Sequence, residues 1–224
     1  VDIGTTTVVA ELVEMATGRE LCSYSQLNSQ KSFGQDVITR IHCTIENSDG
    51  LKRLQHAVLN DLRRLFGELC KETGVKPEQV TNIAVAGNTT MVHLFLGANP
   101  ASIALAPFIP LIKGPARVLA SELSLPAAEH CEVYCLPAVA SFVGGDITGG
   151  ILACSLREGS GRTLFIDIGT NGEIVLSNNG RLCCCSCAAG PALEGMNISC
   201  GARAAIGAIE DVRIDGSKVQ ITTI

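Results

Sequence analysis

Apolar residues recur at three- and four-residue spacing in the first third of the chain, which is the pattern of amphipathic helices. One such pattern covers residues 37–45 and directly follows Asp36, an acidic residue that is suited to cap a helix. A longer apolar stripe covers residues 51–73 and ends before Gly74, which suits a helix C-terminus. These positions predict two helices.

Short apolar runs farther along the chain predict strands over residues 81–86 and 132–136. After the first of these strands, Asn88 can cap a helix that reaches Gly97. Residues 99–129 hold five of the eight prolines and predict a long irregular crossing. Strands that alternate with helices are typical of an α/β fold.

A stretch rich in Gly and Ala, residues 137–153, predicts a helix at which another backbone comes very close, since each interior Gly weakens a helix. Asp146 is the one charge in its middle, either exposed to solvent or aimed into a cleft. A last helix is predicted over residues 201–212, and the Asp215-Gly216 pair predicts a final hairpin.

The most informative pattern is a repeat, because residues 1–7 return 165 residues later as residues 166–172. Each copy contains Asp-Ile-Gly-Thr after an apolar strand, followed by a second strand, a Gly-Arg turn and a third strand. The turns are Gly18-Arg19 and Gly180-Arg181. Two copies of one hairpin predict two related lobes that face each other.

The repeated turn has the residues that bind phosphate and metal. Its carboxylate suits a hydrated divalent cation, and its backbone N–H groups and hydroxyls suit phosphate oxygens. We therefore expect Asp2 and Asp167 to position a metal. The candidate phosphate-binding residues are Gly4, Thr5, Thr6, Thr7, Gly169, Thr170, Asn171 and Gly172. The alternative is a duplication whose hairpins serve packing only.

Composition narrows the class of partner. The net charge is -5, the chain has no Trp, and Lys and Arg are not clustered, all of which argue against a nucleic-acid surface. No apolar run reaches about 18 residues, so no membrane span is expected. The chain begins and ends within predicted strands, so we expect it to be a piece of a longer protein.

Eleven cysteines raise the question of metal or redox chemistry. Cys183, Cys184, Cys185 and Cys187 lie in one strand-like run, where neighbours alternate between the two faces. No pair of Cys-x-x-Cys motifs is present, which disfavours a zinc site. The run is interpreted first as small buried residues in a reducing cytosol, with labile cluster binding or thiol redox chemistry as the alternative.

The chain resembles the actin-like ATPase superfamily. Residues 1–7 and 165–173 resemble its first and second phosphate motifs, and residues 137–153 resemble its connecting helix at the hinge. This resemblance implies an α/β, ribonuclease H-like, two-lobed ATPase fold. Residues 1–160 would form the first lobe with the hinge helix. Residues 161–224 would begin the second lobe, which is incomplete here.

A narrower resemblance is to the ATPase part of corrinoid-protein reductive activators, in residues 86–93, 165–173, 188–195 and 199–205. It implies ATP-dependent return of a cobalt(II) corrinoid to cobalt(I), in the cytoplasm of an anaerobe. The partner would be the corrinoid protein of a methyltransferase system, and a homodimer stays open. The implied cofactors are ATP and Mg²⁺, with a [2Fe–2S] cluster elsewhere in the full-length protein.

The resemblance also implies roles for single residues. The two repeated aspartates would hold Mg²⁺ through water from opposite lobes, while Thr5, Thr6 and Thr170 contact the β- and γ-phosphates. Asp146 would orient the attacking water, with Glu173 as the alternative. Three other functions remain open: an ATP-dependent activator of acyl-CoA dehydratases, a small-molecule kinase of the same fold, and a filament-forming relative of actin.

Overall fold

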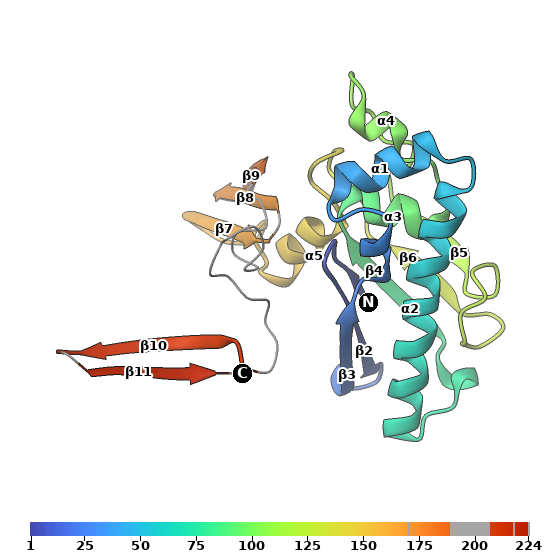
Figure 1. Cartoon of the computed structure of the whole chain (residues 1–224), viewed down its shortest axis with the longest axis horizontal. Coiled ribbons are helices and arrows are strands. Elements are labelled where there is room, and N and C mark those ends of the chain that lie inside the picture. Colours follow the sequence, from blue (N-terminus) through green and yellow to red (C-terminus); the bar gives the residue numbers. More distant parts are fainter. Residues whose placement is uncertain (170, 189–206, 217, 224) are drawn as a thin grey trace.

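The computed structural model describes residues 1–169, 171–188, 207–216 and 218–223. Its largest sheet has six strands in the order β3-β2-β1-β4-β6-β5 (Figure 1). These strands are β1 (Asp2–Ile3), β2 (Thr7–Glu14), β3 (Arg19–Leu27), β4 (Asn82–Gly87), β5 (Ala116–Leu119) and β6 (Glu132–Cys135). β1 pairs antiparallel with β2 and parallel with β4, so the first hairpin is joined directly to the parallel part of the sheet.

The described residues form helices of 4 to 24 residues. They are α1 (Val37–Glu46), α2 (Gly50–Thr73), α3 (Thr89–Leu96), α4 (Ala101–Ala104) and α5 (Gly145–Ala153), with short 3₁₀ turns η1 (Ser29–Ser32) and η2 (Pro77–Gln79). Asp36 accepts a hydrogen bond from the backbone N–H of Thr39 in a capping box. Gly74 ends α2 in the left-handed conformation, at φ 70°. The helices predicted over residues 37–45 and 51–73 are therefore confirmed.

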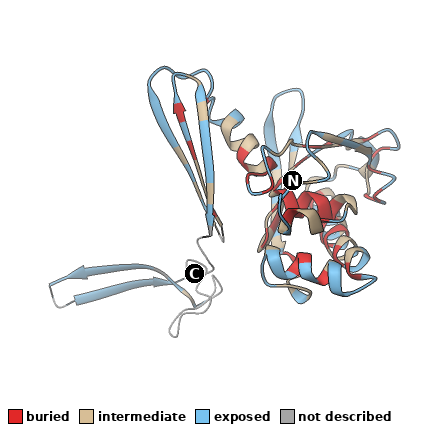
Figure 2. Ribbon diagram, turned by 90° about the horizontal axis from the view of Figure 1, so that it is seen from above, coloured by how far each residue is buried: buried red, intermediate tan, exposed pale blue. Residues whose placement is uncertain are grey.

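The main core lies between α2 and the six-stranded sheet. Leu54, Val58 and Leu62 of α2 are fully buried, as are Ile3 and Val8 of the first hairpin. Burying one such side chain contributes about 1.5–3 kcal/mol. This packing makes the first hairpin a rigid support, and Figure 2 shows burial concentrated in this part of the chain.

The second copy of the hairpin forms a separate three-stranded antiparallel sheet, of β7 (Arg162–Ile168), β8 (Asn171–Asn178) and β9 (Arg181–Ala188). The two Gly-Arg turns match in backbone conformation, with φ 72° at Gly18 and 76° at Gly180. The predicted duplication of the hairpin is therefore present in the structure.

Helix α5 connects the two hairpins (Figure 1). A Cβ atom added to Gly150 would lie 2.6 Å from the ring of Phe165 on β7, so the helix approaches that strand as closely as a glycine permits. Ile147 of α5 and Val175 of β8 are fully buried in the same small apolar cluster. The close approach of another backbone predicted for the Gly-rich stretch is confirmed at Gly145, where an added Cβ atom would lie 2.8 Å from the carbonyl oxygen of Leu136.

Three expectations about local structure were wrong. Residues 137–144 are not helical, because Ala140 and Val143 form a β-bridge and the Thr89 hydroxyl bonds the Ala140 carbonyl, so α5 begins only at Gly145. The irregular crossing contains β5, which pairs with β6. Residues 209–212 of the last predicted helix belong to a strand, and residues 201–206 lie outside the described residues.

That strand, β10 (Ile209–Asp215), pairs with β11 (Lys218–Thr223) and confirms the final hairpin. The cysteine run lies on β9, where Cys183, Cys184, Cys185 and Cys187 are all exposed. Its interpretation as buried residues is wrong for this chain, because all four of these side chains are exposed, whereas Leu182 of the same strand packs against the apolar cluster that contains Ile147.

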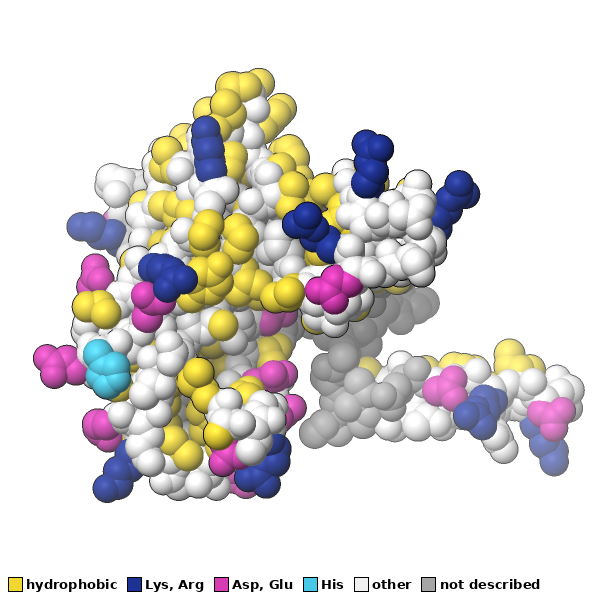
Figure 3. All heavy atoms as spheres, turned by 180° about the vertical axis from the view of Figure 1, so that it is seen from behind, with side chains coloured by type: hydrophobic (Ala, Val, Ile, Leu, Met, Phe, Trp, Pro, Cys, Tyr) yellow, Lys and Arg dark blue, Asp and Glu magenta, His cyan; other side chains and the backbone are white. Residues whose placement is uncertain are grey.

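The rest of the surface adds two observations. Apolar side chains gather after α4, where Leu105, Phe108, Ile109 and Leu111 are exposed, at the top of Figure 3. None of the helices within the described ranges has the length and apolar character needed to cross a membrane.

Candidate phosphate-binding site

The two repeated turns meet in a cavity of about 380 Å³, beside the N-terminal ends of α3 and α5. Ten of the twelve predicted site residues line it: Asp2, Gly4, Thr5, Thr6, Thr7, Asp146, Asp167, Gly169, Asn171 and Glu173. Gly172 instead pairs within the β7–β8–β9 sheet, and Thr170 lies outside the described residues. Residues separated by 165 positions in the sequence thus share one cavity.

The first turn is tight and needs a glycine. The backbone N–H of Gly4 donates to the carbonyl oxygen of Thr7 at 2.9 Å. A Cβ atom on Gly4 would lie 2.7 Å from that same oxygen, closer than real Cβ contacts allow. The turn therefore keeps its shape only with glycine at this position.

The second turn is closed by a tighter bond, from the N–H of Gly169 to the carbonyl oxygen of Asn171, two residues on, at 3.0 Å. Here a Cβ atom on the glycine would lie 3.4 Å from the nearest oxygen, an ordinary contact. Asp167 is paired with Glu173 across β7 and β8, which brings two carboxyl groups to one end of this hairpin.

Asn88 lines the cavity too, although the sequence indicated only a helix cap. Its side-chain oxygen does cap α3 by accepting from the N–H of Met91 at 3.0 Å. Its side-chain nitrogen donates to the hydroxyl of Thr5 at 3.0 Å. The helix cap therefore also orients a hydroxyl of the first turn, and no spacing in the sequence predicts this contact.

The carboxyl groups of the cavity act on one another. Burial raises the pKa of Asp146 to about 6, opposed by the hydrogen bond from the N–H of Ile147 and reinforced by Glu173, Asp2 and Asp167. Burial likewise raises the pKa of Asp2, where the Val1 amino group opposes and Asp167 reinforces the effect. A cation in this cavity would relieve that repulsion.

The pKa of Glu173 is also raised by burial, against a hydrogen bond from the hydroxyl of Ser186 at 3.0 Å. Within the described ranges, no three acidic, His or Cys side chains converge closely enough to ligate one ion directly. Several carboxylates around a polar cavity fit a hydrated Mg²⁺, which keeps most of its own water ligands.

His93, the titratable residue of α3, has a structural position. It is buried, its Nδ1 lies 2.7 Å from the carbonyl oxygen of Thr89, and its Nε2 accepts from the N–H of Ile112. Burial lowers its pKa, so the ring is neutral at pH 7. His93 is therefore a packed residue of α3.

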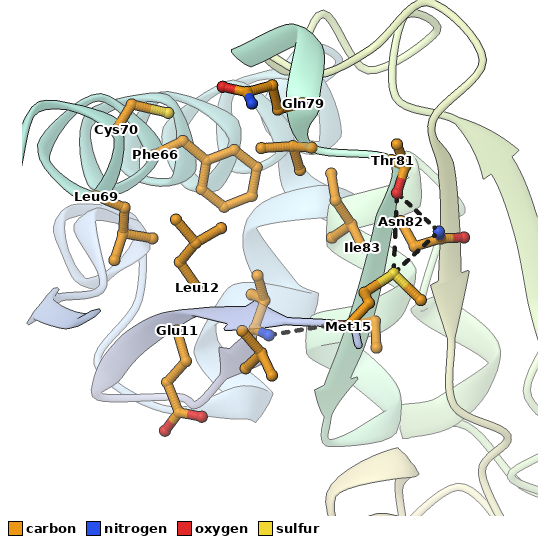
Figure 4. Close-up of a pocket in the computed structure, with 14 residues that line it drawn as sticks. Glu11, Leu12, Met15, Phe66, Leu69, Cys70, Gln79, Thr81, Asn82 and Ile83 are labelled. Carbon is orange, nitrogen blue, oxygen red and sulfur yellow. Dashed lines mark hydrogen bonds between the residues drawn. The ribbon is translucent and has the colours of Figure 1, made fainter. Parts of the chain in front are cut away.

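A second cavity, of about 430 Å³, lies at the far end of β2 between that strand, α2 and β4 (Figure 4). Figure 4 shows Leu12, Phe66 and Ile83 around it, with Met15 near Asn82. Its walls are mostly apolar and Glu11 is their one carboxylate, so it lacks the paired acids and repeated turns of the first cavity.

The whole chain matches models of one protein family. Residues 1–159 match the RACo middle region, and residues 161–224 match the C-terminal domain of RACo, the ASKHA domain. The solved structure of a reductive activator for corrinoid, iron-sulfur protein superposes with a TM-score of 0.91 at 48% identity, covering 99% of this chain and 36% of that one. These matches confirm the predicted actin-like α/β fold.

Two curated relatives match over the full length of the chain. The corrinoid activation enzyme RamQ of Eubacterium limosum is 36% identical over 223 residues, covering 37% of that protein. The [Co(II) methylated amine-specific corrinoid protein] reductase of Methanosarcina barkeri is 27% identical over 232 residues, covering 42% of it. The chain thus spans about two fifths of the length of these relatives.

Proposed function

Because the chain belongs to the RACo family, we propose that it is part of the ATP-binding unit of a reductive activator of corrinoid proteins. The observation that carries this proposal is the convergence of both Asp-Ile-Gly-Thr turns on one cavity lined by Asp2, Asp146, Asp167 and Glu173. Two phosphate-type turns that face each other can hold a polyphosphate tail from both sides. The names of the relatives support a corrinoid protein as the partner.

We assign residues 1–160 to the first lobe, with α5 as its hinge helix, and residues 161–224 to the start of the second. The boundary between the two family models, at residue 160, supports this division. So does the position of α5 between the two copies of the hairpin. The proposed ATP site then lies between the lobes.

Asp2 and Asp167 would hold Mg²⁺ through water, and the bound ion would supply positive charge to the phosphates. The hydroxyls of Thr5 and Thr6 and the N–H groups of their turn would bind phosphate oxygens. Thr170 stays a prediction on the second turn, and Gly172 is left out because it does not line the cavity. Binding and orientation by such groups are the main contribution of the protein to phosphoryl transfer.

Asp146 is the better candidate to accept a proton from the attacking water. Its pKa of about 6 leaves the carboxylate mostly ionised at pH 7 yet still basic enough to take up a proton. The carboxylate of Glu173 accepts a hydrogen bond from the Ser186 hydroxyl, which uses part of its capacity as an acceptor. We therefore assign to Asp146 the role of accepting the proton of the attacking water, and to Glu173 a supporting role beside it.

Phosphates bound by both turns would draw the hairpins together about α5, and hydrolysis would release them. In the full-length protein, a [2Fe–2S] cluster outside this chain would supply the single electron that converts cobalt(II) to cobalt(I). The change in lobe position would couple ATP hydrolysis to that electron transfer by altering how the protein binds the corrinoid protein. We place this protein in the cytoplasm, with a homodimer as one arrangement.

The test uses the full-length protein, a chemical reductant and a cobalt(II) corrinoid protein, with cobalt(I) followed by absorbance. We expect cobalt(I) to form only with Mg-ATP and to be lost in Asp167→Asn. Asp49→Asn, on the exposed start of α2, is the matched control and should keep full activity. Cobalt(I) formation without ATP would contradict the proposal, and ATP turnover without any change at cobalt would favour the kinase or dehydratase-activator alternatives.

A further inference from the structure

Arg40 on α1 is fully buried, and the hydrogen-bond partners of its side chain among the described residues are all neutral acceptors. Its Nε donates to the Gly34 carbonyl at 3.0 Å, and its Nη1 approaches Gln30 Oε1 at 3.2 Å and Met91 Sδ at 3.1 Å. Its Nη2 donates to the carbonyl oxygen of Thr5 at 2.6 Å. The last contact is the shortest, and it joins the guanidinium to the first phosphate-type turn.

Within the part of the chain that the structure describes, no Asp or Glu lies at ion-pair distance from this guanidinium. Exposed Asp36 acts on it only from farther away, and burial lowers the pKa of Arg40 to about 10. The group is therefore still charged at pH 7. A buried charge without a partner is costly, so a compensating anion is expected nearby when the protein works.

Asn28 and Arg40 hold three successive carbonyl oxygens of the first turn. Asn28 donates from its side chain to the carbonyl of Gly4 at 2.8 Å and from its backbone to the carbonyl of Thr6 at 2.8 Å. Arg40 takes the carbonyl of Thr5, which lies between them. Asn28 is itself fully buried, so this support is rigid.

A trans peptide holds its C=O and N–H groups in opposite directions. Because the carbonyls of Gly4 and Thr5 point back toward Asn28 and Arg40, the N–H groups of the same two peptides point the other way. Gly4, Thr5 and Thr6 also line the cavity, and no residue of α1 is among its lining residues. A charged donor on the carbonyl further polarises the peptide, which strengthens its N–H as a donor to an anion.

We propose that Arg40 is a positioning residue for phosphate: it holds the Thr5 carbonyl from behind, and the phosphate bound across the turn supplies the negative charge that its buried guanidinium lacks. The proposal rests on the proposed ATP site. It differs from a purely structural role, in which Arg40 would only tie η1, α1 and α3 together. A structural tie would affect every ligand alike, whereas phosphate positioning is selective for the charged part of the nucleotide.

The experiment measures binding of Mg-ATP and of adenosine to the full-length protein by calorimetry, before and after Arg40→Lys. Lysine keeps the charge but cannot make the same forked set of contacts. We expect affinity for ATP to fall about 10-fold or more, as for loss of one charged hydrogen bond. Affinity for adenosine should be unchanged, and Arg64→Lys, an exposed arginine on α2, should change neither.

Equal affinities of Arg40→Lys and the unmodified protein for ATP, or equal losses for ATP and adenosine, would overturn the role of Arg40 alone. Failure of the unmodified protein to bind ATP would overturn the proposed function and this inference with it. If Arg40→Lys does not fold, the slowly exchanging guanidinium protons of the buried arginine can be followed by NMR in the unmodified protein. They should shift with inorganic phosphate or ATP and not with adenosine, and an unchanged signal would refute the proposal.

Discussion

The role of Asp146 leads to a prediction about pH. Burial and the neighbouring carboxylates raise its pKa from 3.8 to about 6, so keeping it ionised costs about 3 kcal/mol as an upper value. With a pKa of about 6 the ionised fraction is about nine tenths at pH 7 and about one tenth at pH 5. If the carboxylate accepts the proton of the attacking water, ATP hydrolysis should fall between those values by at most about tenfold, because a bound cation lowers the pKa that the neighbouring carboxylates help to raise.

The assay is phosphate release from ATP by the full-length protein between pH 5 and pH 8, with Mg²⁺ kept saturating. Asp146→Asn should lower the rate by about 10²- to 10⁴-fold, the usual contribution of a positioned base, and should abolish the fall toward pH 5. Glu173→Gln is the matched control, since it removes a second carboxylate of the same cavity. It should lower the rate less and leave that part of the profile in place. The assignment is refuted if Asp146→Asn keeps the same pH profile, or if Glu173→Gln is the variant that loses it.

Three further predictions concern glycines and stability. Gly4→Ala should abolish ATP binding in calorimetry, because its Cβ would lie 2.7 Å from a carbonyl oxygen. Gly169→Ala should weaken binding only a few-fold, because its Cβ would lie 3.4 Å from the nearest oxygen, an ordinary contact distance, and equal losses would contradict this reasoning. Gly150→Ala should destabilise the folded protein by about 1–3 kcal/mol, because the added Cβ meets the Phe165 ring where α5 contacts β7. Gly67→Ala on α2 should stabilise the folded protein by about 0.5–1 kcal/mol, because its Cβ meets nothing within 4 Å. Thermal unfolding measures both effects. Without Mg²⁺ and nucleotide, protonation of Asp146 favours the folded state, and this stabilisation is fully present below pH 3.8 and is lost as the pH rises through about 6. Asp146→Asn should therefore raise the unfolding temperature at pH 8 and not at pH 4. An equal shift at both pH values would be inconsistent with the raised pKa of Asp146.

Elements whose signals are local were predictable. Asp36 and Gly74 mark a helix start and a helix end through bonds within a few residues of themselves, so α1 and α2 appear where the pattern puts them. The duplicated turn was visible for the same reason, because each copy contains a glycine and is closed by a backbone bond to a residue two or three positions on.

Elements that depend on distant neighbours were not predictable. Residues 137–144 have a helical composition but form a loop, in which the Thr89 hydroxyl donates a hydrogen bond to the Ala140 carbonyl and Ala140 forms a β-bridge with Val143. The strand β10 exists because β11 pairs with it, although its sequence also suits a helix. Propensity is a weak guide wherever such pairing outweighs it.

The amino-acid sequence by itself determined the two Asp-Ile-Gly-Thr turns, the α/β class and the identity of the acidic and hydroxyl groups available for phosphate. Only the tertiary structure decided that Asp2, Asp146 and Asp167 share one cavity, and that Arg40 and Asn28 support the first turn from behind. The physical reason is that a pKa shift, a buried charge and the direction of a carbonyl arise from groups brought together across many residues. Such properties belong to the folded arrangement, and no single segment carries them.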